Sequence, residues 1–293
     1  MWTEDFLSYL ALERNYSPRT VGEYRDDLDA FESYYKEMDG TLSWATIDED
    51  VVRDWLVSMM EAGRAATTVN RRLSALRTFY KFLLKRGRVE RDPVRDIQGP
   101  KKRKPLPVFV KEREMDRLLD GAFFGDGFSG KRDKLMLEMF YVTGIRLSEL
   151  TGLDTCDVDR GRRVVKVTGK RNKQRVVPFG DELDALLEDY FAARDAAGAS
   201  RDGPMFVDGK GRRISSCRVR RTVQKYLGLV TTLKKRSPHV LRHTFATSML
   251  NHDADLETLK ELMGHESIST TEVYAHTTFE ELKRMYNQAH PRA

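Results

Sequence analysis

Residues 92–107 read DPVRDIQGPKKRKPLP, and this stretch divides the sequence in two. It contains four prolines, one glycine and the run of four bases at residues 101–104, and no helical or strand period continues through it. This composition is typical of a linker. We therefore predict two domains, 1–91 and 108–293, joined by a basic, proline-rich linker. The length of 293 residues agrees, because it is about twice that of a usual domain.

The sequence before the linker predicts a four-helix domain. Ser17 and Pro18 have the residue types of an N-cap and a first helical position. That helix is the second; the first is expected over residues 2–14 and the third over residues 50–61. In the fourth, apolar residues recur at helical spacing between residues 69 and 83, and Gly87 can cap its end. The opposite face of that helix is basic and suits phosphates, with Arg71, Arg72, Arg77, Lys81 and Lys85.

The sequence after the linker predicts a second, mainly helical domain. Two β-branched runs, 163–168 and 174–179, flank the segment GKRNK and indicate a hairpin. Helical patterns cover residues 111–123, 131–143, 181–197, 215–229, 238–251 and 255–263. The predicted fold class is therefore mainly α with a small antiparallel β-sheet.

Composition argues against several classes of protein. No apolar run approaches the ~20 residues that a membrane span needs, and the opening MWTEDFLSYL lacks the basic and apolar regions of a secretion signal. Two cysteines, Cys156 and Cys217, exclude a disulfide scaffold and a zinc cage of thiolates. We expect a cytoplasmic protein without membrane contact.

The charge is distributed unevenly around a net value of +6. Between residues 20 and 62, twelve acidic residues face three basic ones. The bases cluster at 101–104, at 160–175 and at 210–221, and the last two clusters contain no acid. Any one cluster is equally well explained as a solvated surface, but three together favour a nucleic-acid partner.

Three segments carry candidate chemistry. In TGIRLSEL, residues 143–150, Arg146 falls at a junction between two helices. In HVLRH, residues 239–243, the side chains of His239, Arg242 and His243 share one side of a helix. Two histidines four residues apart also form half of a zinc site. However, no third ligand is apparent and an arginine would lie beside the metal, so an anionic oxygen is the better match.

The third segment is MGHESISTTEVYAH, residues 263–276, which contains His265 and Tyr274. By itself a tyrosine is usually part of a core, and this chain has eleven. Tyr274 is distinguished only by the residues that accompany it along the sequence.

Together these motifs resemble the tyrosine site-specific recombinases of the phage integrase family. The resemblance covers essentially the whole chain, and the closing residues QAHPRA (288–293) are most similar to the Xer subgroup, which resolves chromosome dimers. Ser248, Asp253 and Met263 depart from residues common in that subgroup, but none is one of the six catalytic positions. The catalytic residues that the resemblance implies are Arg146, Lys170, His239, Arg242, His265 and Tyr274.

The resemblance implies a role for each of these side chains. Tyr274 attacks a DNA phosphate and becomes joined to its 3′ side. Arg146 and Arg242 grip the non-bridging oxygens, and His265 adds a hydrogen bond. His239 accepts the proton of the tyrosine, and Lys170 protonates the leaving 5′ oxygen, with Lys173 as a rival for that role. No metal, ATP or other cofactor is implied.

The resemblance also implies how the protein is organised. The N-terminal domain (1–91) matches the family's SAM-like core-binding domain, and 108–293 matches the catalytic domain, the two forming a clamp on DNA. The implied partners are double-stranded DNA with a specific core site, a homo- or hetero-tetramer with itself or a paralogue, and a DNA translocase or accessory protein. The expected DNA contacts are Arg71, Arg72, Arg77, Lys81, Lys101, Lys102, Arg103, Lys104, Arg171, Lys173, Arg218, Arg220 and Arg221.

Some alternatives stay open at this stage. The function is expected to be chromosome or plasmid dimer resolution through a Holliday junction, in the nucleoid. A mobile-element integrase, a non-catalytic site-binding protein and a topoisomerase-like relaxing enzyme are the alternatives. The apolar stripe of a tail helix over 278–288 either packs on its own domain or docks on a neighbouring protomer.

Overall fold

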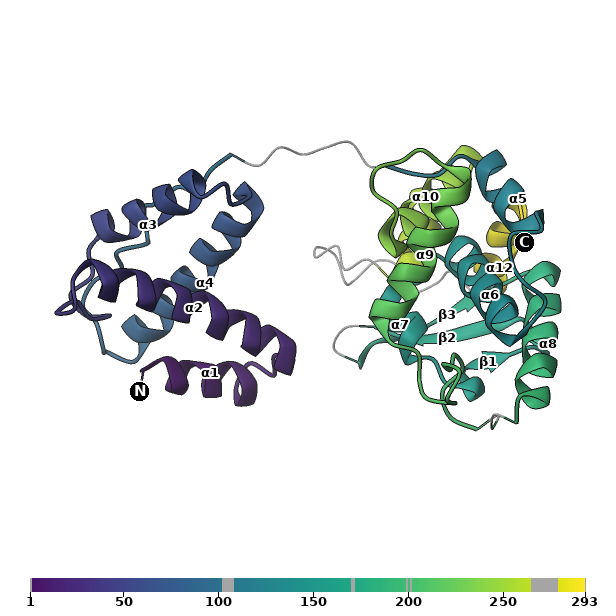
Figure 1. Cartoon of the computed structure of the whole chain (residues 1–293), viewed down its shortest axis with the longest axis horizontal. Helices are drawn as coiled ribbons and strands as arrows, with labels where there is room; N and C mark the ends of the chain where they lie inside the picture. Colours follow the sequence, from purple (N-terminus) through teal and green to yellow (C-terminus); the bar gives the residue numbers. More distant parts are fainter. Residues whose placement is uncertain are drawn as a thin grey trace. The chain divides into compact units, whose positions relative to one another are not determined.

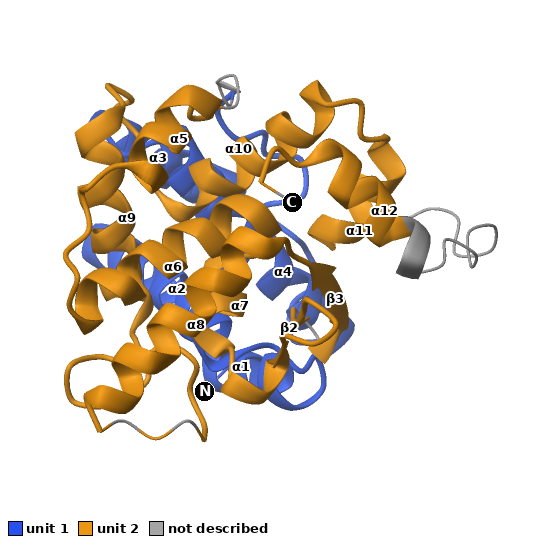
Figure 2. Cartoon of the chain, turned by 90° about the vertical axis from the view of Figure 1, so that its right-hand side faces the viewer, with its two compact units in different colours: residues 1–105 blue, residues 106–293 orange. Residues whose placement is uncertain are grey.

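The computed structural model describes residues 2–101, 108–169, 172–198, 200, 202–264 and 279–292. The chain forms two compact units, residues 1–105 and 106–293, called here the N-terminal and C-terminal units (Figures 1 and 2). Both are mainly helical, and a small antiparallel sheet lies in the C-terminal unit, which confirms the predicted fold class. Within the described part of the chain, every helix is too short or too polar to cross a lipid bilayer.

The described residues of the N-terminal unit form four helices around an aromatic core. The side chains of Ser17 and Asp48 cap the second and third helices by accepting backbone N–H groups. In the core, the ring of Phe31 lies 4.7 Å from that of Trp55 and 5.7 Å from that of Trp44. The helices are α1 (Trp2–Leu12), α2 (Pro18–Met38), α3 (Glu49–Glu61) and α4 (Ala66–Lys85).

The first part of the predicted linker packs on this unit. Val94 and Ile97 are buried in its core. The Asn70 side chain donates a hydrogen bond of 2.8 Å to the carbonyl of Pro100. The composition did not indicate this anchoring, because Val94 and Ile97 are two isolated apolar side chains among prolines and charges, and the hydrogen bond is to a backbone carbonyl.

The C-terminal unit packs its helices around a three-stranded antiparallel sheet in the order β1-β2-β3. The hairpin pairs Thr168 with Gln174 and Val164 with Pro178, as the β-branched runs predicted. The two-residue strand β1 was not predicted, whereas the short helix α7 is the one expected after the junction at Arg146. The elements are α5 (Glu112–Asp120), α6 (Phe128–Thr143), α7 (Leu147–Gly152), β1 (Val158–Asp159), β2 (Val164–Thr168), β3 (Gln174–Pro178), α8 (Asp181–Ala196), α9 (Ser216–Val230), α10 (Pro238–Asn251), α11 (Leu256–Met263) and α12 (Phe279–Ala289).

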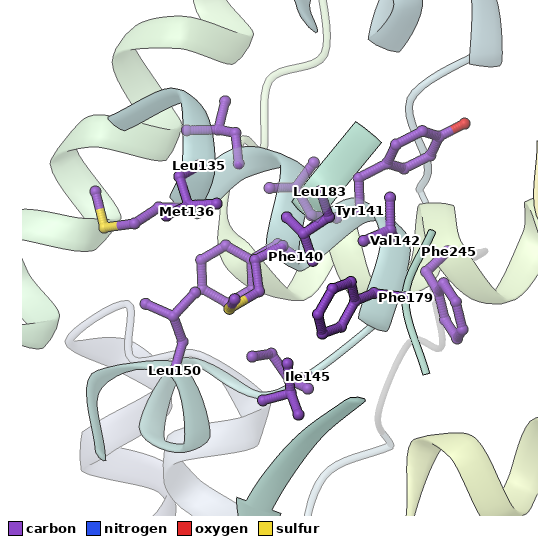
Figure 3. Close-up of a cluster of buried hydrophobic side chains, with 14 of the residues drawn as sticks. Leu135, Met136, Phe140, Tyr141, Val142, Ile145, Leu150, Phe179, Leu183 and Phe245 are labelled. Carbon is purple, nitrogen blue, oxygen red and sulfur yellow. The ribbon is translucent and has the colours of Figure 1, made fainter. Parts of the chain in front are cut away.

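Helix α6 is the centre of the C-terminal unit. Every residue of this helix from 135 to 143 is buried, as expected for a helix surrounded by protein on all sides. Figure 3 shows Leu135, Phe140 and Val142 among the buried side chains of this core. The helix ends at Gly144, whose φ of 58° is left-handed. A Cβ atom at Gly144 would lie 2.3 Å from Cδ1 of Phe245 on α10. Glycine therefore lets α10 approach the end of α6 closely.

The tail helix α12 packs on its own unit in the single chain. Leu282, Tyr286 and Ala289 are buried, and the ring of Tyr286 stacks on that of His290 at 5.6 Å. Docking of this helix on a neighbouring protomer stays a prediction.

Candidate active site

Arg146 and Arg242 come from different helices and meet at the same helix end. Arg146 is the N-cap residue of α7, two residues after the glycine that ends α6. Arg242 lies in the second turn of α10. Both side chains reach the C-terminal end of α11, at its last residue Met263 and at the following Gly264.

Arg146 is fixed by hydrogen bonds to a carboxylate and a carbonyl. Its Nη1 lies 2.8 Å from Oε1 of Glu149, and its Nη2 donates to the carbonyl of Gly264 at 2.8 Å. Its backbone N–H donates to Oε2 of Glu149 at 2.7 Å. Among the described residues, these contacts use two of the five guanidinium N–H groups. The side chain is 28% exposed, so the other N–H groups can meet a ligand.

Arg242 is more deeply buried and has neutral partners. Its Nη1 donates to the carbonyl of Gly144 at 2.5 Å, and its Nη2 donates to that of Met263 at 2.6 Å. Burial lowers the pKa of Arg242 to about 10, and the nearby cation of Arg146 adds to this effect. The group remains charged at neutral pH. Since carbonyls carry no full charge, its positive charge is available to an anion.

Glu149 and Arg175 belong to the same cluster, and the sequence analysis missed them. The Glu149 side chain is fully buried and receives both Nη1 and Nη2 of Arg175, at 2.8 and 2.9 Å. Burial alone would raise the pKa of Glu149, but the hydrogen bonds and charges of Arg175 and Arg146 bring it to about 2. A glutamate three residues after a helix-capping position was the available sequence signal.

His239 lies in the first turn of α10, one turn before Arg242, and is exposed. Partial desolvation of its ring lowers the pKa of His239 below its ordinary value of 6.5, and electrostatic interactions with Lys235, His243, Arg242 and Arg220 act in the same direction. At neutral pH the imidazole is therefore uncharged and can accept a proton. The cationic neighbours Lys235 and Arg220 were not part of the predicted catalytic set.

Lys170, His265 and Tyr274 lie outside the described residues. The residues that precede Lys170 and His265, which are Gly169 and Gly264, are described. A Cβ atom at Gly169 would lie 3.3 Å from Oε1 of Glu149 and 4.0 Å from Nη1 of Arg146. The cluster is thus bordered by Gly169, which precedes the predicted lysine, and by Gly264, which precedes the predicted histidine.

Sequence comparison identifies the family. The phage integrase family matches residues 109–281, and the phage integrase N-terminal SAM-like domain matches residues 3–87. The chain belongs to the phage integrase family. This family member is also similar along its whole length to curated recombinases. It is 37% identical to tyrosine recombinase XerC of Chlorobaculum tepidum, over 100% of this chain and 95% of the relative.

Two further relatives agree. Tyrosine recombinase XerC of Mycobacterium sp. (strain KMS) is 39% identical over 98% of both chains. Tyrosine recombinase XerD of Oceanobacillus iheyensis is 37% identical over 99% of this chain and 98% of the relative. The chain is therefore a Xer-like tyrosine recombinase, which confirms the resemblance seen in its motifs.

Solved structures share the fold of this recombinase. The Tn1549 transposon integrase in complex with a circular intermediate DNA has a TM-score of 0.73 at 19% identity, over 98% of this chain and 99% of that one. The XerH recombinase bound to its difH substrate has a TM-score of 0.71 at 22% identity, over 96% of this chain and 82% of that one. At these identities the likeness concerns the fold alone.

The bases of α4 that were predicted to contact DNA differ in whether they bind other groups of the protein. Arg71 pairs with the buried carboxylate of Asp27, and Arg72 lies 3.6 Å from the same group. Arg77 donates to the carbonyl of Ile97 and so anchors the segment after α4. Lys81 is exposed. The basic face of α4 thus includes at least one arginine that helps to hold the unit together.

In the C-terminal unit of the recombinase, Arg218, Arg220 and Arg221 are exposed on α9, whereas Val219 between them is buried. Lys173 is exposed after the hairpin turn, and in the other unit Lys101 is exposed at the end of the described segment. Lys102, Arg103, Lys104 and Arg171 lie outside the described residues.

A basic hollow of about 740 Å³ lies beside the N-terminus of α9. Its lining includes one acid, Asp208. The sequence predicted the basic cluster at 210–221 but not the other residues of this lining. The basic residues that line it are Arg132, Lys210, Arg212, Arg213 and Arg218.

Proposed function

We propose that this recombinase cleaves and rejoins DNA at a specific core site, with Tyr274 as nucleophile and without a metal ion or ATP. The observation that carries the proposal is the meeting of Arg146 and Arg242 at the end of α11, with His239 one turn before Arg242 on α10. Two guanidinium groups held by carbonyls can stabilise the negative charge that develops on a phosphate under attack.

The proposed reaction conserves a phosphodiester bond. The Tyr274 oxygen attacks phosphorus, its proton passes to His239, and a bond from phosphorus to Tyr274 replaces the bond to the 5′ oxygen. Lys170 protonates that oxygen, and His265 hydrogen-bonds the phosphate. The reverse reaction with the 5′ hydroxyl of another strand completes the exchange, so no external energy source is needed.

The proposal extends to the setting of the reaction. Double-stranded DNA is the substrate, in line with the DNA complexes formed by proteins of the same fold. Exchange between two duplexes through a Holliday junction requires a tetramer, composed of this chain alone or with a paralogue. Resolution of chromosome or plasmid dimers in the cytoplasm, with a translocase or accessory protein, is the process that the XerC and XerD relatives favour.

A nicked duplex that carries a candidate core site tests the chemistry. Incubated in chelator, the protein should form a covalent complex at the 3′ phosphate. Tyr274→Phe should abolish the complex and keep DNA binding, whereas the control Tyr226→Phe, at another tyrosine of the same unit, should keep both. A complex that persists in Tyr274→Phe, or that forms only with a divalent metal, would contradict the mechanism.

A further inference from the structure

The C-terminus of α11 is held by three arginines from three different elements. Residues 262–264 offer three consecutive carbonyls, and each accepts a hydrogen bond from a different side chain. Arg175 Nε donates to Leu262 at 2.7 Å, Arg242 Nη2 to Met263 at 2.6 Å, and Arg146 Nη2 to Gly264 at 2.8 Å. The carbonyls that end a helix have no partners within it and carry partial negative charge, so cations stabilise them.

Arg175 differs from the other two arginines in its position and its partners. It lies on β3, its side chain is only 15% exposed, and both its Nη atoms are bound to Glu149. Glu149 in turn holds the backbone and the guanidinium of Arg146. One side chain therefore connects the hairpin, α7 and the end of α11.

We propose that Arg175 is a positioning residue, which sets the geometry of Arg146 through Glu149 and that of the end of α11 through Leu262. This inference rests on the proposed function, because it assumes that Arg146 contacts the reacting phosphate. Arg175 itself does not touch the reacting atoms in this assignment.

The charges around Glu149 explain why Arg175 is needed. The structure places three cations near this buried carboxylate: Arg146 from the start of α7, Arg175 from β3 and Arg242 from α10. Without Arg175, each oxygen of Glu149 loses one hydrogen bond, and Arg146, which already donates to Oε1, is the cation that remains to pair with the carboxylate. The guanidinium of Arg146 would then shift toward Glu149 and away from the ligand.

Formation of the covalent complex with the nicked duplex, in a single turnover at saturating DNA, tests the proposal. Arg175→Ala is expected to slow it about 10- to 100-fold, since a displacement of about 1 Å can cost 100-fold in rate. The Kd for the same DNA should change less than twofold. Arg175→Lys keeps the charge, but its single nitrogen cannot span both oxygens of Glu149 and the carbonyl of Leu262, so it should be slowed similarly and should not restore the rate.

A double-mutant cycle shows whether Arg175 acts through Glu149. If it does, Glu149→Gln and Arg175→Ala together should be no slower than the slower single variant. The matched control is Arg160→Ala, which removes a bidentate pair with Asp184 elsewhere in the same unit and should retain the parent rate.

The outcomes separate this proposal from the proposed function. Suppose that the parent protein forms the covalent complex. The positioning role is then overturned if both Arg175 variants form it at the parent rate, or if the effects of Glu149→Gln and Arg175→Ala are independent in the cycle. Loss of folding in both variants, seen by circular dichroism, would assign Arg175 to stability and also overturn it. If the parent protein forms no complex on any core site, the proposed function fails first.

Discussion

Arg242 on α10 donates a hydrogen bond of 2.6 Å to the carbonyl of Met263, the last residue of α11. Through Nη1 the same side chain also binds the carbonyl of Gly144, which ends α6. A single guanidinium thus ties together the ends of two helices and presents its charge at the point where they meet.

Arg242→Lys should slow covalent-complex formation by at least about 100-fold, the usual cost of removing a donor that stabilises transition-state charge. A lysine keeps the positive charge but cannot reach two carbonyls and a phosphate together. The measurement is the single-turnover rate on the nicked duplex. Arg162→Lys, at an exposed position, is the control, and an equal loss there would show that the effect is not specific to the site.

The rate of complex formation should depend on the protonation of His239. Its pKa lies below 6.5, so the neutral base predominates at pH 7 and is lost as the pH falls through that pKa. The rate should therefore be constant above about pH 7 and decline at lower pH. In His239→Gln the rate should be low at every pH, and it should not decline further as the pH falls. A decline of unchanged size in that variant would rule out His239 as the proton acceptor.

Arg220→Gln and Arg77→Gln should separate DNA contact from stability. Arg220 is exposed on α9, and its loss should reduce the slope of log Kd against log salt concentration by about one. Arg77 instead holds the carbonyl of Ile97, so Arg77→Gln should lower the Tm and leave the slope nearly unchanged. Fluorescence anisotropy with a labelled duplex and thermal melting give the two readouts. If instead Arg77→Gln reduced the slope and Arg220→Gln lowered the Tm, Arg77 would be the DNA contact and Arg220 the stabilising residue.

Arg292→Ala should destabilise the C-terminal unit more at high pH than at low pH. Arg292 lies 2.9 Å from the fully buried carboxylate of Glu138, and burial raises the pKa of Glu138 to about 7. Without the arginine, the buried carboxyl can still be neutral at pH 5, but at pH 8 it must either lose its proton without a partner or hold it at a cost. Above neutral pH the loss should approach about 3 kcal/mol, the range for a broken buried pair.

Urea unfolding of the Arg292→Ala variant at pH 5 and at pH 8 gives this comparison. Arg284→Ala, at an exposed position on α12, the helix that precedes Arg292, should cost little at either pH. An equal loss for Arg292→Ala at both values would show that Glu138 does not titrate in this range.

Periodicity and motif spacing were sufficient for much of this molecule. The hairpin around GKRNK, the capped helix at Ser17 and the junction at Arg146 follow from local residue types, because β-branched runs, N-caps and helix-ending glycines act within a few residues. The order of the motifs along the chain indicated the family, whereas no single motif was sufficient to do so.

The rest depended on contacts between distant parts of the chain. Glu149 and Arg175 are 26 residues apart, and nothing in either local sequence indicates that they pair. Likewise, Arg77 resembled the other bases of its helix until Ile97, 20 residues later, proved to be its partner. Tertiary packing decides whether an arginine can contact DNA or is bound within the fold. The spacing of residues along one helix gives no information about that packing.

The neutral partners of Arg242 have a consequence for the empty protein. Among the described residues of this cluster, Glu149 is the one carboxylate near the three cations of Arg146, Arg175 and Arg242, so the cluster holds an excess of positive charge in a partly desolvated place. Before substrate arrives, the mutual repulsion of these cations opposes folding, and a bound polyanion removes that penalty. Heparin or sulfate should therefore raise the melting temperature of the C-terminal unit and compete with the duplex, even though neither contains a bond that the enzyme can break.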